Sequence, residues 1–148
     1  MEDFIELQIV SAVRELLSGR VNEILNDWQN FIPLFEISDF QCGMAVVPKI
    51  TLSECELTEK ERIIRLDAYS ITISFSLQET PEAELFCYAY TNAVCKALRE
   101  DPTLGGVIDR VTVCGKKYIE PKKQGCGQDW EVVIGLRATV ENQITGNK

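Results

Sequence analysis

The clearest pattern of hydrophobic and polar positions in the chain runs from residue 69 to residue 77. Apolar and polar side chains alternate strictly over this stretch, and the apolar ones are Tyr69, Ile71, Ile73, Phe75 and Leu77. Only an extended strand with one apolar face satisfies a period of two residues. The pattern therefore predicts a β-strand whose apolar face is buried.

A helical pattern follows this strand and runs to about Glu100. Its apolar residues recur at spacings of three and four positions, and they are Phe86, Ala89, Tyr90, Ala93, Ala97 and Leu98. One face of this helix can therefore lie on the apolar side of the preceding strand. Thr80 is a suitable N-cap, with Pro81 in the first turn. The helix is predicted to end at Asp101-Pro102, because the residue before a proline is pushed out of the helical region.

Two further strands are predicted after the double glycine at residues 105–106. Residues 107–119 return along the sheet, and residues 130–140 again alternate apolar with polar side chains. Residues 121–128 between them are glycine-rich and predict a turn. We expect strand 69–77 to run parallel to strand 107–119 because a helix connects them, and the last strand to run antiparallel to the one before it.

The N-terminal part of the chain predicts two amphipathic helices. The apolar residues of the first helix fall on one face, and they are Phe4, Ile5, Ile9, Ala12, Val13, Leu16 and Leu17. Gly19 lies just past the end of this helix, which is typical of a C-terminal cap position. A shorter second helix is predicted over residues 21–28 and is broken before Pro33.

The region between these helices and strand 69–77 is less regular. Residues 42–50 predict a strand that lies at a sheet edge or ends at Pro48, since proline cannot donate a hydrogen bond to a β-ladder. Residues 51–65 are polar and charged, and they predict a long solvated loop or a projecting hairpin. Such a segment is a candidate arm towards a neighbouring molecule.

These elements predict an α+β fold with a mixed, mostly antiparallel β-sheet, a central long helix and N-terminal helices packed on it. A length of 148 residues, of which 45 % are hydrophobic, fits a single domain spanning residues 1–148. No apolar run approaches the roughly 20 residues that cross a bilayer. The acidic start, with Glu2 and Asp3, also differs from a signal peptide. We therefore expect no membrane span and synthesis in the cytoplasm.

The charge of the chain is unevenly distributed. Its formal net charge is -8, and its first forty residues hold eight acids against Arg14 and Arg20. A net negative charge repels a phosphate backbone, which argues against general nucleic-acid binding. Four lysines gather around the predicted hairpin after residue 110, and they are Lys116, Lys117, Lys122 and Lys123. They either solubilise a loop or form a surface that contacts a partner.

Motifs for catalysis, metal binding or cofactor binding are missing from the sequence. The chain has no histidine and no Walker-type loop, dinucleotide fingerprint or nucleophile elbow. The acid pairs Glu82 with Glu84 and Asp129 with Glu131 are better explained as helix-start and strand-surface charges. We therefore predict no catalytic residue and no enzyme.

The chain contains six cysteines, at positions 42, 55, 87, 95, 114 and 126. None of them has the spacing of a usual zinc site. Cys87 and Cys95 lie about 12 Å apart along the central helix, at about 1.5 Å per residue, which is too far for a disulfide. We expect the cysteines to be small buried hydrophobic residues, with no metal and no cofactor.

The second half of the chain resembles a known family. The resemblance covers about residues 65–141, and the segments that carry it are residues 67–73, a helix ending in residues 97–106, residues 111–113, Tyr118 and residues 130–134. Their common frame is strand, helix, strand, strand, with the turn D-P-T-L-G-G at residues 101–106. This frame is similar to the small tail-completion or tail-terminator proteins of long-tailed bacteriophages and prophages.

The resemblance implies a non-enzymatic virion protein, made in the host bacterial cytoplasm and located in the tail. Members of the family assemble as rings, usually hexamers, that end the tail tube and join it to the head. The implied partners are further copies of the chain, the tail tube and head-completion proteins, with DNA only passing through the channel. Lys116, Lys117, Lys122 and Lys123 are the candidate contact residues. The alternatives are a small soluble protein- or ligand-binding module and, less favoured, an enzyme without a recognisable motif.

Overall fold

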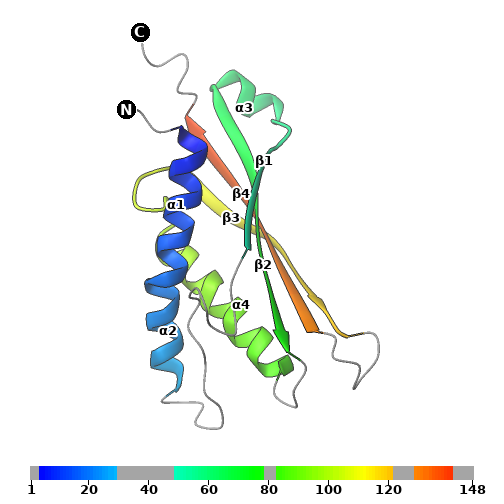
Figure 1. Ribbon diagram of the computed structural model, residues 1–148. Coiled ribbons are helices and arrows are strands. Elements are labelled where there is room, and N and C mark those ends of the chain that lie inside the picture. Colours follow the sequence, from blue (N-terminus) through cyan, green and yellow to red (C-terminus); the bar gives the residue numbers. More distant parts are fainter. Residues whose placement is uncertain (1–3, 30–48, 79–82, 122–128, 142–148) are drawn as a thin grey trace.

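The computed structural model describes residues 4–29, 49–78, 83–121 and 129–141. Three helices lie on one side of a four-stranded sheet (Figure 1), and they are α1 (Ile5–Ser18), α2 (Arg20–Gln29) and α4 (Ala83–Glu100). The strands are β1 (Lys49–Glu54), β2 (Leu66–Gln78), β3 (Arg110–Ile119) and β4 (Asp129–Glu141). A short helix, α3 (Glu59–Ile63), connects β1 to β2. The predicted α+β class is confirmed, but the sheet formed by the described strands is wholly antiparallel rather than mixed.

The sheet has the order β1-β2-β4-β3, and every neighbouring pair is antiparallel. Because β2 and β3 are both antiparallel to β4, they run parallel to each other, as the sequence predicts. They are not neighbours, however, since the last strand lies between them. The prediction that β4 runs antiparallel to β3 is also confirmed.

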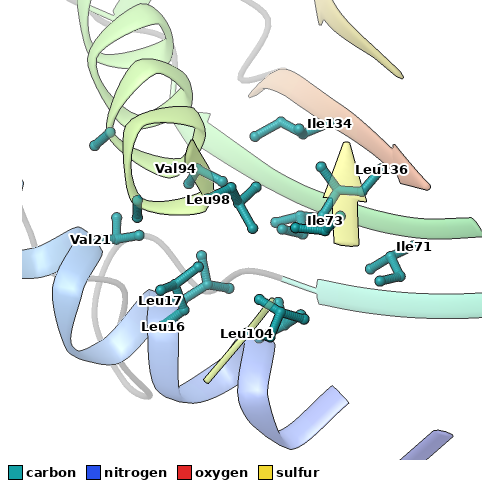
Figure 2. Packing of buried hydrophobic residues seen from close by; sticks show 14 of the residues in the cluster. Leu16, Leu17, Val21, Ile71, Ile73, Val94, Leu98, Leu104, Ile134 and Leu136 are labelled. Carbon is teal, nitrogen blue, oxygen red and sulfur yellow. The ribbon is translucent and has the colours of Figure 1, made fainter. Parts of the chain in front are cut away.

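The alternating apolar side chains of β2 line one side of the hydrophobic core. Ile73 pairs with Ile134 of β4, Ile71 pairs with Leu136, and all four side chains are buried. Leucines and valines of α1, α2 and α4 pack against this face in one continuous cluster (Figure 2). The predicted burial of the apolar face of strand 69–77, and the packing of the central helix on it, are therefore confirmed.

The opposite face of the sheet is polar and more exposed. On β2 it carries Ser70, Thr72 and Ser74, which are half-buried, and Ser76, which is exposed. None of the three longer helices covers this face (Figure 1). We call it the open face.

Helices α1 and α2 follow one another with only Gly19 between them. The Gly19 N–H donates to the Glu15 carbonyl at 2.9 Å, and the Gly19 carbonyl accepts from the Glu23 N–H at 3.0 Å. A Cβ atom at this position would lie only 3.0 Å from the Glu15 carbonyl oxygen, which explains the glycine. Both predicted N-terminal helices are confirmed, with Gly19 at the predicted cap position.

The segment between α2 and β2 differs from its prediction. The described residues begin at Lys49, and β1 extends through residues 51–54, where the sequence indicated a loop. Residues 59–63 are helical, so the interpretation of 51–65 as a solvated loop is wrong. The hairpin alternative is closer, because β1 pairs antiparallel with β2. Of the edge strand predicted over 42–50, the described residues 49 and 50 lie in β1, which is an edge strand. Ile50 and Leu52 pair with Ile73 and Ile71, so the partner strand stabilises a segment whose own sequence is only weakly strand-like.

The turn after α4 is longer than the sequence predicts. The helix ends at Glu100 as expected, and Leu104, Gly105 and Gly106 have φ angles of 51°, 70° and 91°. A Cβ atom at Gly105 or Gly106 would meet nothing within 4 Å, so lack of space does not explain these glycines. Their positive φ angles do, because residues with a side chain rarely adopt them. Strand β3 starts at Arg110 rather than at residue 107, because residues 107–109 still belong to the turn and bury Ile108.

Some expectations fall outside the described residues. They concern the N-cap at Thr80 with Pro81, the break before Pro33, the first part of the strand predicted at 42–50, and the glycine turn within 121–128.

Candidate interaction surfaces

Two of the four candidate lysines lie on strand β3. Lys116 pairs with Ile134, whose side chain is on the core side of the sheet, whereas Lys117 pairs with Val133 on the open face. Both lysine side chains are exposed, but they leave the strand on opposite sides. Lys122 and Lys123 lie outside the described residues. The structure therefore does not bring Lys116 and Lys117 together in a patch on one face.

Strand β3 is an edge strand of the sheet. Its pairing with β4 is interrupted by a β-bulge between Val113 and Gly115, directly before the two lysines. Bulges and exposed lysines are features by which natural sheets keep a free edge from pairing with another chain. This position supports the solubilising interpretation of Lys116 and Lys117. The contact interpretation stays a prediction.

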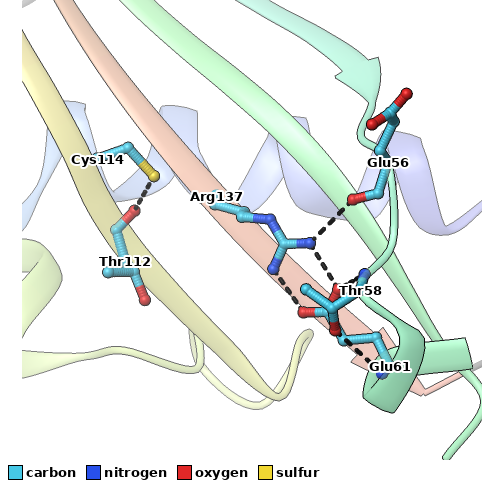
Figure 3. A network of polar contacts seen from close by, with 6 residues as sticks. All are labelled: Glu56, Thr58, Glu61, Thr112, Cys114 and Arg137. Atoms are coloured by element: carbon cyan, nitrogen blue, oxygen red, sulfur yellow. Dashed lines mark hydrogen bonds and ion pairs between the residues drawn. The ribbon is translucent and has the colours of Figure 1, made fainter. Parts of the chain in front are cut away.

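A second polar site joins the open face to the segment between β1 and β2 (Figure 3). Arg137 of β4 donates two hydrogen bonds to the Glu61 carboxylate of α3, at 2.6 and 2.7 Å, and a third to the Glu56 carbonyl at 3.1 Å. Glu61 in turn accepts from the Thr58 N–H at 2.8 Å, while the Thr58 hydroxyl accepts from the Glu61 N–H at 3.2 Å. This capping box fixes the start of α3, and the bidentate ion pair holds α3 over the open face.

The Arg137 guanidinium changes the acid–base properties of Glu61. Its hydrogen bonds, followed by the hydrogen bond from the Thr58 N–H, lower the pKa of the Glu61 carboxyl from 4.5 to about 2. The same pair raises the pKa of Arg137 further above its ordinary value. The ion pair therefore stays charged at every pH at which the protein is ordinarily handled.

We expect the Glu61→Gln variant to lose less thermal stability in acid than the parent protein does. A folded-state pKa below the unfolded value means that stability from this group is fully present above about pH 4.5 and is lost as the pH falls towards 2. The melting temperature of the parent, followed by circular dichroism, should drop more steeply over this range than that of Glu61→Gln. Glu59→Gln, which changes an exposed acid on the same helix, should follow the parent. Parallel curves for the parent and Glu61→Gln would show that the ion pair contributes nothing.

An equivalent ion pair joins the start of α2 to the end of α4. Arg20 donates to both carboxylate oxygens of Glu100, at 2.7 and 3.1 Å, and a third acceptor is Glu23 at 3.4 Å. The Arg20 hydrogen bonds lower the pKa of Glu100 to about 2. This contact fixes the N-terminal helices on the central helix, so its role is structural.

A groove of about 450 Å³ lies between α1 and the turn after α4. Its lining is mostly apolar or uncharged, with a single carboxylate, and consists of Leu7, Gln8, Ser11, Ala12, Glu15, Leu104, Gly105 and Val107. Leu7 is exposed, and Phe4, one helical turn before it, is also exposed. The turn D-P-T-L-G-G therefore forms one wall of an accessible hollow, which the sequence analysis did not predict.

Helix α4 carries two cysteines, Cys87 and Cys95, and neither thiol is activated as a nucleophile. Burial raises the pKa of Cys87 to about 11 and also raises the pKa of Cys95. Both thiols stay protonated near neutral pH, when a thiol nucleophile would have to be ionised. The expectation of buried cysteines is confirmed for these two and wrong for Cys114, which is exposed on β3 and donates to the Thr112 carbonyl at 3.8 Å (Figure 3). Cys55 is half-buried.

Among the residues that the structure describes, no group of three acidic or cysteine side chains could hold a metal ion. Glu84 accepts a hydrogen bond from the Tyr88 hydroxyl at 3.0 Å, while Asp129 and Glu131 are exposed on β4. Over the same ranges, no helix has the length and apolarity needed to span a membrane.

Sequence reasoning missed both the Arg137–Glu61 pair and the groove. The spacing Thr58-x-x-Glu61 is a capping-box signature and could have revealed α3. Nothing in the sequence shows that α3 would meet Arg137, 76 positions further along the chain. In the comparisons with known proteins, no family model and no curated sequence matches this chain.

Proposed function

We propose that this protein is a structural component of a bacteriophage or prophage tail. It forms a ring at the end of the tail tube, ends tail assembly and joins the tail to the head. In this role it has no enzymatic activity and binds no cofactor. Its partners are copies of itself, the tail tube and head-completion proteins.

The observation that carries the proposal is the succession of β2, α4, the turn at residues 101–106, β3 and β4. It corresponds to the strand-helix-strand-strand frame through which the sequence resembles the tail-terminator family. The D-P-T-L-G-G turn is stabilised by its own side chains, since Asp101 accepts from the Gly105 N–H at 3.0 Å and Thr103 accepts from the Gly106 N–H at 3.1 Å. The turn therefore has a defined shape that a neighbouring molecule can recognise.

The charge of the chain is compatible with this role. A ring around DNA must let the duplex pass without holding it, and the net charge of -8 favours a channel that repels phosphate. The acidic residues of the N-terminal helices and the lysines near β3 provide opposite charges on one small molecule. Opposite charges at two different sites favour head-to-tail contacts between identical subunits.

We expect the purified protein to form closed rings, detected by negative-stain electron microscopy and light scattering. Replacing Lys116, Lys117, Lys122 and Lys123 together by glutamate should weaken self-association in a salt-sensitive way. The fold should be retained, because exposed charges contribute little to stability. Since Lys116 and Lys117 lie on opposite sides of the sheet, the two single reversals should differ, and their difference identifies the side that is in contact.

Two results would count against the proposal. If the quadruple variant assembles like the parent at low salt, the lysines serve only solubility. If the parent itself is monomeric at all concentrations, ring formation is excluded. The second candidate function, a small protein-binding module, is favoured by the groove beside α1 and would then be preferred.

A further inference from the structure

The end of helix α3 exposes two neighbouring isoleucines. Ile63 is 73 % exposed and Ile64 is 51 % exposed, so two adjacent large apolar side chains form one contiguous apolar surface. Arg62 and Arg65 flank them in sequence, and both arginines are exposed. We call residues 62–65 the α3 knob.

The α3 knob is held in place rather than free. The Arg137–Glu61 ion pair fixes α3 on the sheet, and the Ile64 N–H donates to the Lys60 carbonyl at 3.0 Å. Arg65 has a φ angle of 61°, which a non-glycine residue adopts only at some cost. This left-handed residue turns the chain sharply into β2 and leaves the isoleucines on the outside. A fixed apolar surface loses little conformational entropy on binding, so it is suited to contact.

The groove beside α1 has the complementary properties. It offers Leu7, Leu104 and Val107 as apolar lining, and Glu15 is the one charged residue of that lining. The α3 knob has an apolar centre between two cationic residues. Apolar surface therefore matches apolar surface, and an arginine can meet the Glu15 carboxylate.

The two surfaces lie on opposite sides of the sheet of one molecule. The α3 knob lies at the end of the β1–β2 hairpin, where α3 contacts the open face, whereas the groove is lined by α1 and the turn after α4. Figure 1 shows α1 and α3 on opposite sides of the sheet. They cannot meet within one chain. We propose that the α3 knob of one subunit inserts into the α1 groove of the next, so that copies of this chain associate head to tail.

This inference rests on the proposed function and gives it a specific interface. A head-to-tail contact between two different surfaces closes into a ring if the rotation permits, and otherwise forms an open filament. Two isoleucines in one groove bury far less than the roughly 800 Å² per partner of a standard interface. A single contact is therefore weak, and the assembly gains stability when it closes and each subunit is held on both sides.

The test uses two variants of the full chain. One removes the knob (Ile63→Ser with Ile64→Ser), and the other places a cation in the groove, where it would face the arginines of the knob (Leu7→Lys). The matched control is Leu85→Lys, because Leu85 is also an exposed leucine on a helix, at 42 % against 57 % for Leu7, but lies outside both surfaces. Sedimentation velocity over a range of concentrations measures self-association, and circular dichroism checks folding.

We expect each variant to raise the dissociation constant at least about tenfold, because a buried cation next to the knob arginines or a lost apolar contact weakens binding. The control should assemble like the parent. At the highest concentrations, where a single weak contact is populated, a mixture of the knob variant with the groove variant should give a one-to-one dimer and nothing larger, since only one intact knob and one intact groove can meet. This result is specific to a head-to-tail contact.

The outcomes separate the interface from the ring. If the parent forms rings and both variants still do, the interface is wrong while the proposed function stands. If the parent forms knob-dependent filaments or dimers without closed rings, the interface is right and the proposed function fails. If Leu7→Lys lowers the melting temperature more than Leu85→Lys without changing self-association, the groove is covered by another part of the same chain and the interface is wrong. A parent that is monomeric throughout overturns both.

Discussion

Replacing Ile73 by aspartate is expected to prevent stable folding. Ile73 has no exposed surface and lies opposite Ile134 and Ile50, in the middle of the sheet and under the helices. An aspartate there would bury a carboxylate without a partner, at a cost of several kcal/mol. A domain of ordinary stability, about 5–15 kcal/mol, would lose much or all of its free energy of unfolding. Chemical denaturation monitored by tryptophan fluorescence measures the loss.

The matched control for this variant is Thr72→Asp. Thr72 is the preceding residue of β2, but its side chain is on the open face and is only half-buried. Its carboxylate would remain in contact with water, so we expect a loss of at most about 1 kcal/mol. If Ile73→Asp and Thr72→Asp unfolded at the same denaturant concentration, the assignment of the buried face would be wrong.

Truncating Tyr90 to alanine is the second large effect that we expect. Tyr90 is almost fully buried in α4, and its ring meets that of Phe75 edge to face, with centroids 5.7 Å apart and planes at 68°. The substitution removes a large aromatic side chain from the centre of the core and leaves a cavity. Comparable substitutions cost about 3–5 kcal/mol.

Tyr88 provides the comparison within the same helix. It lies two positions earlier, is substantially exposed, and contacts Tyr118 of β3 edge to face with centroids 4.9 Å apart. Tyr88→Ala loses this contact but leaves no internal cavity, so we expect about 1 kcal/mol. Equal losses of unfolding free energy for Tyr88→Ala and Tyr90→Ala would contradict the placement of the helix on the sheet.

The sequence predicted the elements whose own pattern is strong. The alternation of β2 and the helical spacing of α4 are local signals, and burial against a single core imposes them on the chain. Strand β1 was misplaced because Ile50 and Leu52 are its only hydrophobic residues that pack against the core, while Lys49 and Glu54 resemble a loop. Its structure depends on pairing with β2, which no local pattern reveals.

The surfaces were harder to predict than the fold. Lys116 and Lys117 are adjacent in sequence, and their grouping as one patch overlooked that neighbours in a strand point to opposite sides. The groove beside α1 could not be predicted either, because Leu7 and Leu104 meet only after α1 packs beside the turn. Such a surface depends on the tertiary structure, whereas a helix or a strand can be predicted from the spacing of its apolar residues.

The position of β4 within the sheet bears on how the chain is made. This strand follows the other three in the sequence, yet it lies between β2 and β3 and pairs with β2 over thirteen positions, from Leu66 opposite Glu141 to Gln78 opposite Asp129. During synthesis, β2 and β3 leave the ribosome before the strand that joins them exists. Until then β2 lacks the buried residues of β4 that complete its apolar face, and the incomplete core favours aggregation of the nascent chain. Pairing of strands so distant in sequence also slows folding after release.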